Sequence, residues 1–515
     1  MSDRPAPGPP PESPGSGADA AAAGSRAGTQ DATAEGVGKR AGKNTLVRAV
    51  GEIVGKLASL VLFGALARAV GPAEVGIFVF AFAYLQIVTM PVGLGLDRLL
   101  VRRVARDRSR LGELTDVLTV KVVVGVPVAV LGVLIIHLLG YDATTRAAVA
   151  LLAPGLLIDS FARSVFSIFT AVEQSGLLSI SVVVQRVLAA ALGLVALAAG
   201  LGVVAVAGTY TLGAAVGLLL AVLLAARRVG LPRVATSRRS RRRLTRLSLP
   251  YAVQDVFGVL LAKVDIVILS LLASEAAVGR YGGAYRLLEA TFFLASSVNG
   301  AFAAMYTYLG PTTDPPLGAV VQRSMKLLLV VLVPCAVVLG VLAEPISVAF
   351  LGGDFKTAAE PLRLLAPAVV LIGVVYLATS LLVSRGNPRR MIVISAAGVA
   401  LNVLLNLTLV PTLGDRGTAA AMLLTEVALA AVVVLLAARE VGGLRWASMV
   451  GGPMLAGLAM GFAMLPFDAA LFPALPLGAV VYAAALVVVE RALDPKDLRF
   501  VVGLLRGRLA FRPGR

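Results

Sequence analysis

Charged residues stand inside long apolar segments of this chain. An ionised side chain at the centre of a bilayer costs roughly 2.5–3.5 kcal/mol even on the lenient insertion scale, so ionisable groups kept there are functional by default. Several of them lie three or four positions apart, which places them on one helix face. The candidates for binding a charged ligand are Arg48, Glu52, Lys56, Asp159, Arg163, Lys263, Asp265, Arg286 and Glu289.

Local pairing is the simpler explanation for some of these charges. Three pairs are spaced to neutralise one another on one helix: Glu52 with Lys56, Asp159 with Arg163, and Arg286 with Glu289. Residues close to a helix end can extend to the lipid headgroups, and this alternative covers Arg48, Lys121 and Arg186. The residues that lie deeper favour a hydrated cavity between two halves of the protein: Lys56, Asp159, Arg163 and Lys263.

Lys263 and Asp265 cannot both face such a cavity. They lie two positions apart, which is about 200° around a helix. We expect Asp265 to pair with a neighbouring helix instead.

The surplus charge among the candidates is positive. A water-filled cavity with excess cations suits an anionic headgroup, and the fork of donors on Arg suits phosphate in particular. A hydrophobic cation would require a lone acid and aromatic walls, but aromatic residues make up only 6% of the chain. The pattern therefore predicts an anionic ligand.

Residues that support enzyme chemistry are scarce. The single cysteine, Cys335, and the single histidine, His137, exclude a thiolate cluster and most zinc sites. The chain also has no GxxxxGK[ST] phosphate-binding loop. We expect no catalytic residues, no metal, no cofactor and no enzyme activity.

Fourteen segments are long and apolar enough to carry these charges into a membrane. A spanning helix needs about 20 mostly apolar residues, and the 515-residue chain is 58% hydrophobic with a mean hydropathy of +0.90. The predicted fold is an all-α polytopic membrane protein with about 14 transmembrane helices, near residues 45–69, 75–96, 114–138, 147–171, 177–200, 203–226, 250–273, 282–306, 324–343, 363–384, 390–411, 417–438, 447–465 and 473–491.

Arginines gather in every second gap between these segments. They run from Arg98 to Arg110 after the second segment and from Arg227 to Arg246 after the sixth. Short loops rich in Arg and Lys stay cytoplasmic, so we expect a multi-pass protein of the cytoplasmic (inner) membrane with both termini cytoplasmic. The net charge of +18 then faces anionic membrane lipids, and no nucleic acid partner is expected.

Short matches recur in order along the chain. Ala153-Pro154 and Ala366-Pro367 are 213 residues apart, and Gly76 and Gly279 stand in similar stretches 203 residues apart. The matches indicate two parallel-repeat six-helix bundles plus two C-terminal helices. The predicted domains are a disordered cytoplasmic N-terminal segment (1–43), an N-terminal bundle (44–227), a basic cytoplasmic linker (228–248), a C-terminal bundle (249–440), two additional transmembrane helices (441–492) and a basic cytoplasmic tail (493–515).

Five stretches carry a family resemblance. They are residues 55–78, Asp265 with 278–284, residues 351–355, residues 402–411 and residues 414–421. Together they cover roughly residues 45–440, and they resemble the polysaccharide (O-antigen or exopolysaccharide type) flippases of the multidrug/oligosaccharidyl-lipid/polysaccharide exporter superfamily. In the most specific stretch, Asn402 and Asn406 share one helix face, and we expect them to join helices rather than bind substrate.

The resemblance implies a transporter that flips polyprenyl-diphosphate-linked oligosaccharide across the cytoplasmic membrane by alternating access, for cell-surface polysaccharide biosynthesis. The diphosphate head would cross through the cavity while the polyprenyl tail stays in lipid. Three alternatives remain: a lipid II flippase, a multidrug or cation antiporter of the same superfamily, and a non-transporting subunit of a polysaccharide synthesis complex. The implied partners are the lipid-linked oligosaccharide, anionic membrane lipids and other polysaccharide assembly proteins.

Overall fold

The protein is described by a computed structural model that covers residues 16–230, 237–310, 313, 316–386, 388–443 and 445–493. All regular structure in these residues is helical, which confirms the predicted all-α membrane protein. The elements are α1 (Ser16–Val88), α2 (Met90–Gly93), α3 (Leu96–Arg106), η1 (Arg108–Gly112), α4 (Glu113–Leu138), α5 (Ala143–Ala171), α6 (Ser175–Ala198), α7 (Val203–Arg228), α8 (Arg238–Leu272), α9 (Glu275–Glu289), α10 (Phe292–Tyr308), α11 (Leu317–Val341), α12 (Ala343–Leu351), η2 (Gly353–Ala358), α13 (Ala359–Ser384), α14 (Pro388–Leu413), α15 (Asp415–Glu440), α16 (Trp446–Met464), η3 (Leu465–Phe467) and α17 (Leu471–Leu493).

Within the described residues, 12 helices are long and apolar enough to cross a membrane, against the 14 segments predicted. Two features account for the difference. The stretch Val50–Val88 counts once, although Gly71 (φ 76°) divides α1 into two legs. The membrane half of α8 holds three charged residues within 18 positions, Asp255, Lys263 and Asp265, and this charge content sets it apart from the 12 helices.

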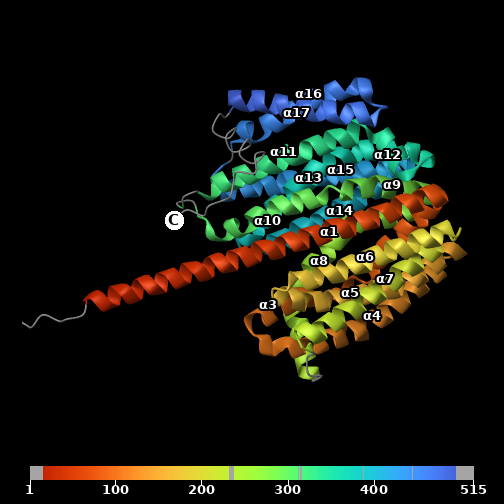
Figure 1. Cartoon of the computed structure of the whole chain (residues 1–515). Coiled ribbons are helices and arrows are strands. Elements are labelled where there is room, and N and C mark those ends of the chain that lie inside the picture. Colours follow the sequence, from red (N-terminus) through yellow and green to blue (C-terminus); the bar gives the residue numbers. More distant parts are fainter. Residues whose placement is uncertain are drawn as a thin grey trace, which may run out of the picture.

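The first leg of α1 begins earlier than expected. Residues 16–43, predicted to be disordered, are helical and extend away from the other helices (Figure 1). This segment contains a run of alanines from Ala20 to Ala23, and alanine has the highest helix propensity of any residue type. Low-complexity composition argues against a packed core, but it does not argue against an isolated helix.

The predicted linker and tail are covered only in part. Within the linker 228–248, α8 begins at Arg238, and residues 231–236 lie outside the described residues. The tail 493–515 also lies outside them, apart from Leu493 at the end of α17.

The chain reverses direction at Gly71, as the opening hairpin of the resembled family would. Gly51 lies against the start of α6, Glu74 against the start of α7, and Asp97 against the second half of α5. The two legs of α1 therefore run antiparallel. We call the end of the bundle that carries Arg98 to Arg110 and Arg238 to Arg246 the basic end, and the other the opposite end.

Two glycines form a crossing between α1 and α9 at the opposite end. A Cβ on Gly76 would lie 1.9 Å from the carbonyl oxygen of Glu275, and a Cβ on Gly279 would lie 1.8 Å from the carbonyl oxygen of Pro72. In each contact a glycine meets the residue four positions before the other glycine, so the two contacts are equivalent. The predicted repeat relates these two glycines, and a two-fold axis between two halves would produce this arrangement.

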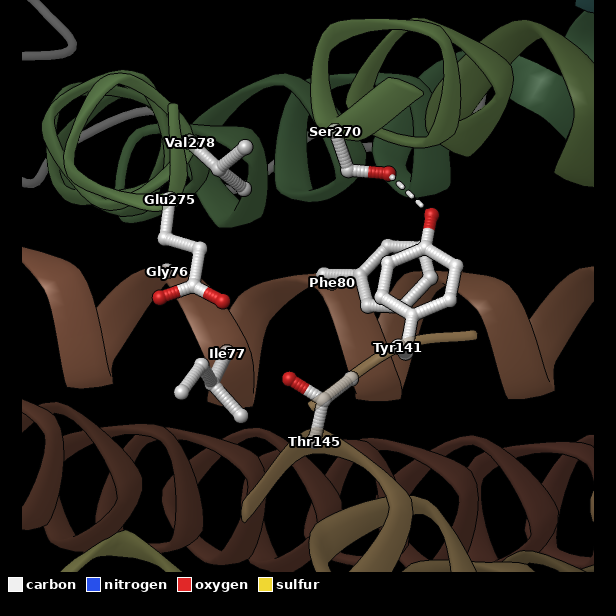
Figure 2. Close-up of a pocket in the computed structure, with 8 residues that line it drawn as sticks. All are labelled: Gly76, Ile77, Phe80, Tyr141, Thr145, Ser270, Glu275 and Val278. Carbon is white, nitrogen blue, oxygen red and sulfur yellow. Dashed lines mark hydrogen bonds between the residues drawn. The ribbon is translucent and has the colours of Figure 1, made fainter. Parts of the chain in front are cut away.

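Little space remains beside this glycine crossing. A cavity of about 20 Å³, the size of one water molecule, lies next to it (Figure 2). The rings of Phe80 and Tyr141 stack there with centroids 4.9 Å apart, and the Tyr141 hydroxyl lies 3.4 Å from Ser270 Oγ. The lining residues are Gly76, Ile77, Phe80, Tyr141, Thr145, Ser270, Glu275 and Val278.

At the basic end, both backbone and side chains join α3 to α8: a Cβ on Gly95, which precedes α3, would lie 2.8 Å from the carbonyl oxygen of Ser248. An Arg98 guanidinium nitrogen lies 2.6 Å from the Asp255 carboxylate, and another donates to Gln254 at 3.3 Å. Arg102 donates to the Tyr251 hydroxyl at 2.8 Å. The N-terminal and C-terminal groups of helices are thus in contact at both ends.

The last two helices pack on the outside of the C-terminal group, against α11 (Figure 1). Lys326 of α11 and Glu490 of α17 form a buried ion pair at 2.5 Å. The Tyr482 hydroxyl donates to the carbonyl oxygen of Val330 at 2.9 Å, and a Cβ on Gly457 would lie 2.5 Å from Val333. Close contacts and polar side chains thus hold α16 and α17 in place.

We expect Gly76→Ala to push the two groups of helices apart at the opposite end, because the added Cβ meets backbone that cannot move alone. Overpacking of this kind costs about 1–3 kcal/mol. Spin labels at the exposed residues Leu139 and Leu413 should report a longer distance than in the wild-type protein. Gly176→Ala, where nothing lies within 4 Å of the new Cβ, is the matched control; equal distances in both variants would contradict the crossing as a spacer.

Candidate functional site

Lys121 is the most deeply buried charge of the N-terminal group. Its side chain has no exposed surface, and Nζ donates to both carboxylate oxygens of Asp97, at 2.9 and 2.8 Å, and to the carbonyl oxygen of Ser160 at 2.7 Å. Ser164 Oγ donates to Asp97 at 2.7 Å. The expectation that Lys121 extends to the headgroups is wrong, because its partners draw it inward.

Asp97 is a residue that sequence analysis missed. It lies in the first turn of α3, just after the chain turns through Leu94 (φ 42°) and Gly95 (φ 64°). A Cβ on Gly95 would lie 2.5 Å from Tyr251, so α3 packs directly on α8 there. The sequence feature that could have identified Asp97 is the glycine two positions before it. A glycine can adopt the positive φ that ends one helix and starts the next, and the acid in the first turn of the new helix can then point inward.

Asp159 and Arg163 form the i,i+4 pair that their spacing predicted, at 3.2 Å. Gln185 of α6 donates to the other carboxylate oxygen of Asp159 at 3.0 Å. The Arg163 side chain is nevertheless 59% exposed, although it also interacts electrostatically with Asp97 and Asp255. With this much exposed surface, the Arg163 side chain is accessible to water. Its pairing with Asp159 therefore leaves guanidinium donors free for other hydrogen bonds.

Arg186 lies in the middle of α6, not near its end. Its side chain packs over Gly55 of α1, and it interacts electrostatically with Tyr210 of α7. The expectation that Arg186 reaches the headgroups is therefore wrong. It joins Arg163 in facing the polar interior of the N-terminal group.

The C-terminal group holds a matching cluster. Glu289 accepts from Lys263 at 3.1 Å through one oxygen and from Arg286 at 3.1 Å through the other. Lys263 Nζ also lies 4.9 Å from the centroid of the Tyr285 ring. Asp265 faces away and accepts from the Tyr281 hydroxyl and the backbone N–H of Ile266, as the separation around the helix predicted.

The remaining candidates lie on α1. Lys56 Nζ lies 6.0 Å from the centroid of the Phe293 ring of α10, and the Arg286 guanidinium lies 5.7 Å from that of Phe63. This face of α1 therefore points towards the C-terminal cluster. Glu52 and Lys56 are both exposed, and within the described residues no ion pair joins them. The Arg48 side chain lies outside the described residues.

Asn402 joins two helices, as expected, whereas the hydrogen bonds of Asn406 in the described residues stay within α14. Asn402 Nδ2 donates to Thr425 Oγ1 of α15 at 3.4 Å. Asn406 Nδ2 donates to the backbone carbonyl of Asn402 at 2.9 Å. Neither reaches the charged clusters.

Positive charge exceeds negative charge across these clusters. Arg163 and Arg286 have acidic partners, and Glu289 also pairs with Lys263. In the described part of the chain no acid lies within ion-pair distance of Lys56 or Arg186. Both clusters contact α1, where Arg186 packs over Gly55 and the Arg286 guanidinium lies over the Phe63 ring. Side chains of this kind suit a doubly charged anion, which accepts several charge-assisted hydrogen bonds.

The fold is shared with several solved transporters. The lipid II flippase MurJ in an inward closed conformation aligns with a TM-score of 0.73 at 12% identity, over 87% of this chain and 99% of that one. An inward-facing multidrug resistance MATE family transporter of the MOP superfamily aligns with 0.63 at 17% identity, over 77% and 98%. A MOP superfamily transporter from Pyrococcus furiosus aligns with 0.57 at 18% identity, over 78% and 96%.

Family models match the sequence itself. The MatE model matches residues 250–408. No curated protein sequence matches the chain. The model described as "Polysaccharide biosynthesis protein" matches residues 41–305, more than half of the chain, and contains both the glycine crossing and the charged residues of α1, α5 and α8. The chain is thus a multi-pass membrane protein that belongs to the polysaccharide biosynthesis protein family.

Proposed function

We propose that this protein flips a polyprenyl-diphosphate-linked oligosaccharide across the cytoplasmic membrane for cell-surface polysaccharide biosynthesis. The observation that carries the proposal is the surplus of cations inside the membrane, with Lys56 and Arg186 lacking acidic partners in the described residues. A diphosphate is the part of such a cargo least able to cross lipid, and Arg and Lys donors replace its water. Membership of the polysaccharide biosynthesis protein family supports this class of cargo.

The two charged clusters suggest how the head is carried. The N-terminal group offers Arg163 and Arg186, and the C-terminal group offers Lys263 and Arg286 across from α1. A head held between both groups can be passed from one end of the bundle to the other when the end contacts open in turn. The oligosaccharide follows the diphosphate, and the polyprenyl tail remains in the bilayer.

We propose that the basic end is cytoplasmic. Exposed arginines of α8 gather there, including Arg238, Arg239, Arg242, Arg243 and Arg246, and they suit anionic lipids of the inner leaflet. Other polysaccharide assembly proteins could dock on the same face. In this orientation both termini are cytoplasmic.

A lipid II flippase is the second candidate. The likeness to MurJ in its inward closed conformation, which covers 99% of that chain, favours it. Its cargo shares the polyprenyl diphosphate, so the same clusters would serve. Deletion of the gene separates the two: inner-leaflet accumulation of lipid-linked glycan supports the first proposal, and accumulation of lipid II with loss of viability supports the second.

We expect Lys56→Gln to depress glycan export at least about 30-fold while the amount of protein in the membrane stays normal. The exposed Lys56 would form a charge pair that the bound cargo buries, and removing one partner of such a pair costs about 2–5 kcal/mol. Lys56→Arg should keep much of the activity. Lys356→Gln, a surface lysine at the opposite end paired with Glu344 at 3.1 Å, is the matched control.

A double change distinguishes cargo binding from simple neutralisation of Glu52. If Lys56 only balances that carboxylate, Glu52→Gln with Lys56→Gln should export glycan normally, because no unpaired charge remains. We expect the double variant to be inactive and well folded. Normal export would remove Lys56 from the diphosphate site.

The orientation is tested with single cysteines in a Cys335→Ser background. A cysteine at Arg242 should react with a membrane-impermeant maleimide only after the cytoplasmic side is opened, and cysteines at Leu139 and Leu413 should react in intact cells. Reaction of the Arg242 cysteine in intact cells would reverse the proposed topology.

A further inference from the structure

A buried acid in the C-terminal group has no role in the clusters described so far. Glu426 lies in the middle of α15, its residue is only 7% exposed, and its Oε2 atom is buried with no hydrogen-bond partner in the described residues. No basic side chain of the described chain lies within ion-pair distance of it. This differs from Asp265, which is also buried but accepts hydrogen bonds from Tyr281 and Ile266.

The helices around Glu426 present few titratable groups. On α9, Tyr285 interacts with it electrostatically, and the same phenol interacts with Glu289 and with Asp265 of α8. On α14 the nearby polar residue is Asn402, which donates to the adjacent Thr425. The charged residues of α13 and α14 lie in their first two turns, far along each helix from this level: Glu360, Arg363, Arg389 and Arg390.

An ionised carboxylate is unfavourable in such a place. Without a cation or a full set of donors, a buried charge loses its hydration and gains nothing in return. The neutral carboxylic acid avoids that cost. We propose that Glu426 is a proton-binding site, occupied in the conformation seen here.

Tyr285 connects this site to the charged cluster that we assign to cargo. Lys263 Nζ lies 4.9 Å from the centroid of the Tyr285 ring, and Tyr285 also interacts electrostatically with Glu426. With Glu426 neutral, Lys263, Arg286 and Glu289 carry a net charge of +1. When the Glu426 carboxyl releases its proton to water, the added carboxylate brings the local sum to zero.

The proton and an anionic cargo should therefore bind cooperatively. An anion is attracted more strongly to the +1 cluster than to the neutral one, and by reciprocity a bound anion favours protonation of Glu426. Proton binding itself does not depend on what is carried, whereas its link to transport rests on the proposed function. The site would let a proton gradient bias the direction of cargo movement.

Infrared titration of purified protein in lipid nanodiscs tests proton binding. We expect the carbonyl band of a protonated carboxylic acid at pH 7, absent from Glu426→Gln and shifted in Glu426→Asp. Glu173→Gln, an exposed acid on the turn between α5 and α6, should leave the band unchanged. A wild-type spectrum at pH 7 without a band assignable to Glu426 would show that it is ionised, and the proposal would fall.

Calorimetric binding of farnesyl diphosphate tests the link to cargo. Between pH 6 and pH 9, the affinity of the wild-type protein should fall at least about fivefold relative to Glu426→Gln, a small coupling by the usual scale. The ratio of the two affinities cancels the titration of the probe itself. Parallel pH profiles would overturn the link to cargo. If neither protein binds the probe, the proposed diphosphate cargo fails, while the infrared result still decides whether Glu426 holds a proton.

Discussion

The contact between the backbones at Gly76 and Gly279 is the constraint on which the rest of the arrangement depends. It brings α1 and α9 closer than any side chain would allow, and its two halves are equivalent. Such a contact is dry and closely packed, so it resists partial opening. The basic end has a looser backbone contact, where a Cβ on Gly95 would lie 2.8 Å from the carbonyl oxygen of Ser248, and an ion pair between Arg98 and Asp255 whose side chains are 53% and 39% exposed. Exposed ion pairs are worth about 0–1 kcal/mol. Because the backbones approach less closely at the basic end and the ion pair adds little, we expect that end to be the easier one to open from this conformation.

Burial of charge follows a consistent rule in the two groups of helices. Where a charge has no exposed surface, as at Lys121, it is fully paired and hydrogen-bonded, because an unpaired buried ion would cost several kcal/mol. Where a charge keeps exposed surface, as at Arg163 and Lys56, pairing is partial or absent in the described residues. The first kind stabilises the fold, and the second kind remains able to bind a ligand. Glu426 fits neither kind, because it is buried and also unpaired in the described residues. Protonation, as proposed above, would remove the cost of burying its charge.

Sequence patterns predicted the features that depend on local composition. The apolar segments, the reversal near Gly71 and the i,i+4 pair of Asp159 and Arg163 follow from hydropathy and spacing alone. The partners of Lys121 could not be predicted in this way, because they depend on which helices touch. The second predicted segment ended at residue 96 and left Asp97 in the gap after it, whereas Asp97 lies in the first turn of α3 and pairs with Lys121. The same limit applies to Arg186, whose role depends on packing over Gly55, and to the lone position of Glu426.

The two halves of the repeat have equivalent residues in the contact at the opposite end, but different residues in the contact at the basic end. At the offset of 203 residues that relates the two glycines, Asp255 corresponds to Glu52, and Arg98 corresponds to Ala301. An alanine cannot form the ion pair that joins α3 to α8, so the sequence permits that contact on one side only. Glu52 and Lys56 accordingly stay exposed on the side of α10. For a cargo whose head is charged and whose tail is lipid, this difference is useful: one side of the basic end can be held shut by charges, while the other lets the head approach the cations and the tail stay in the membrane.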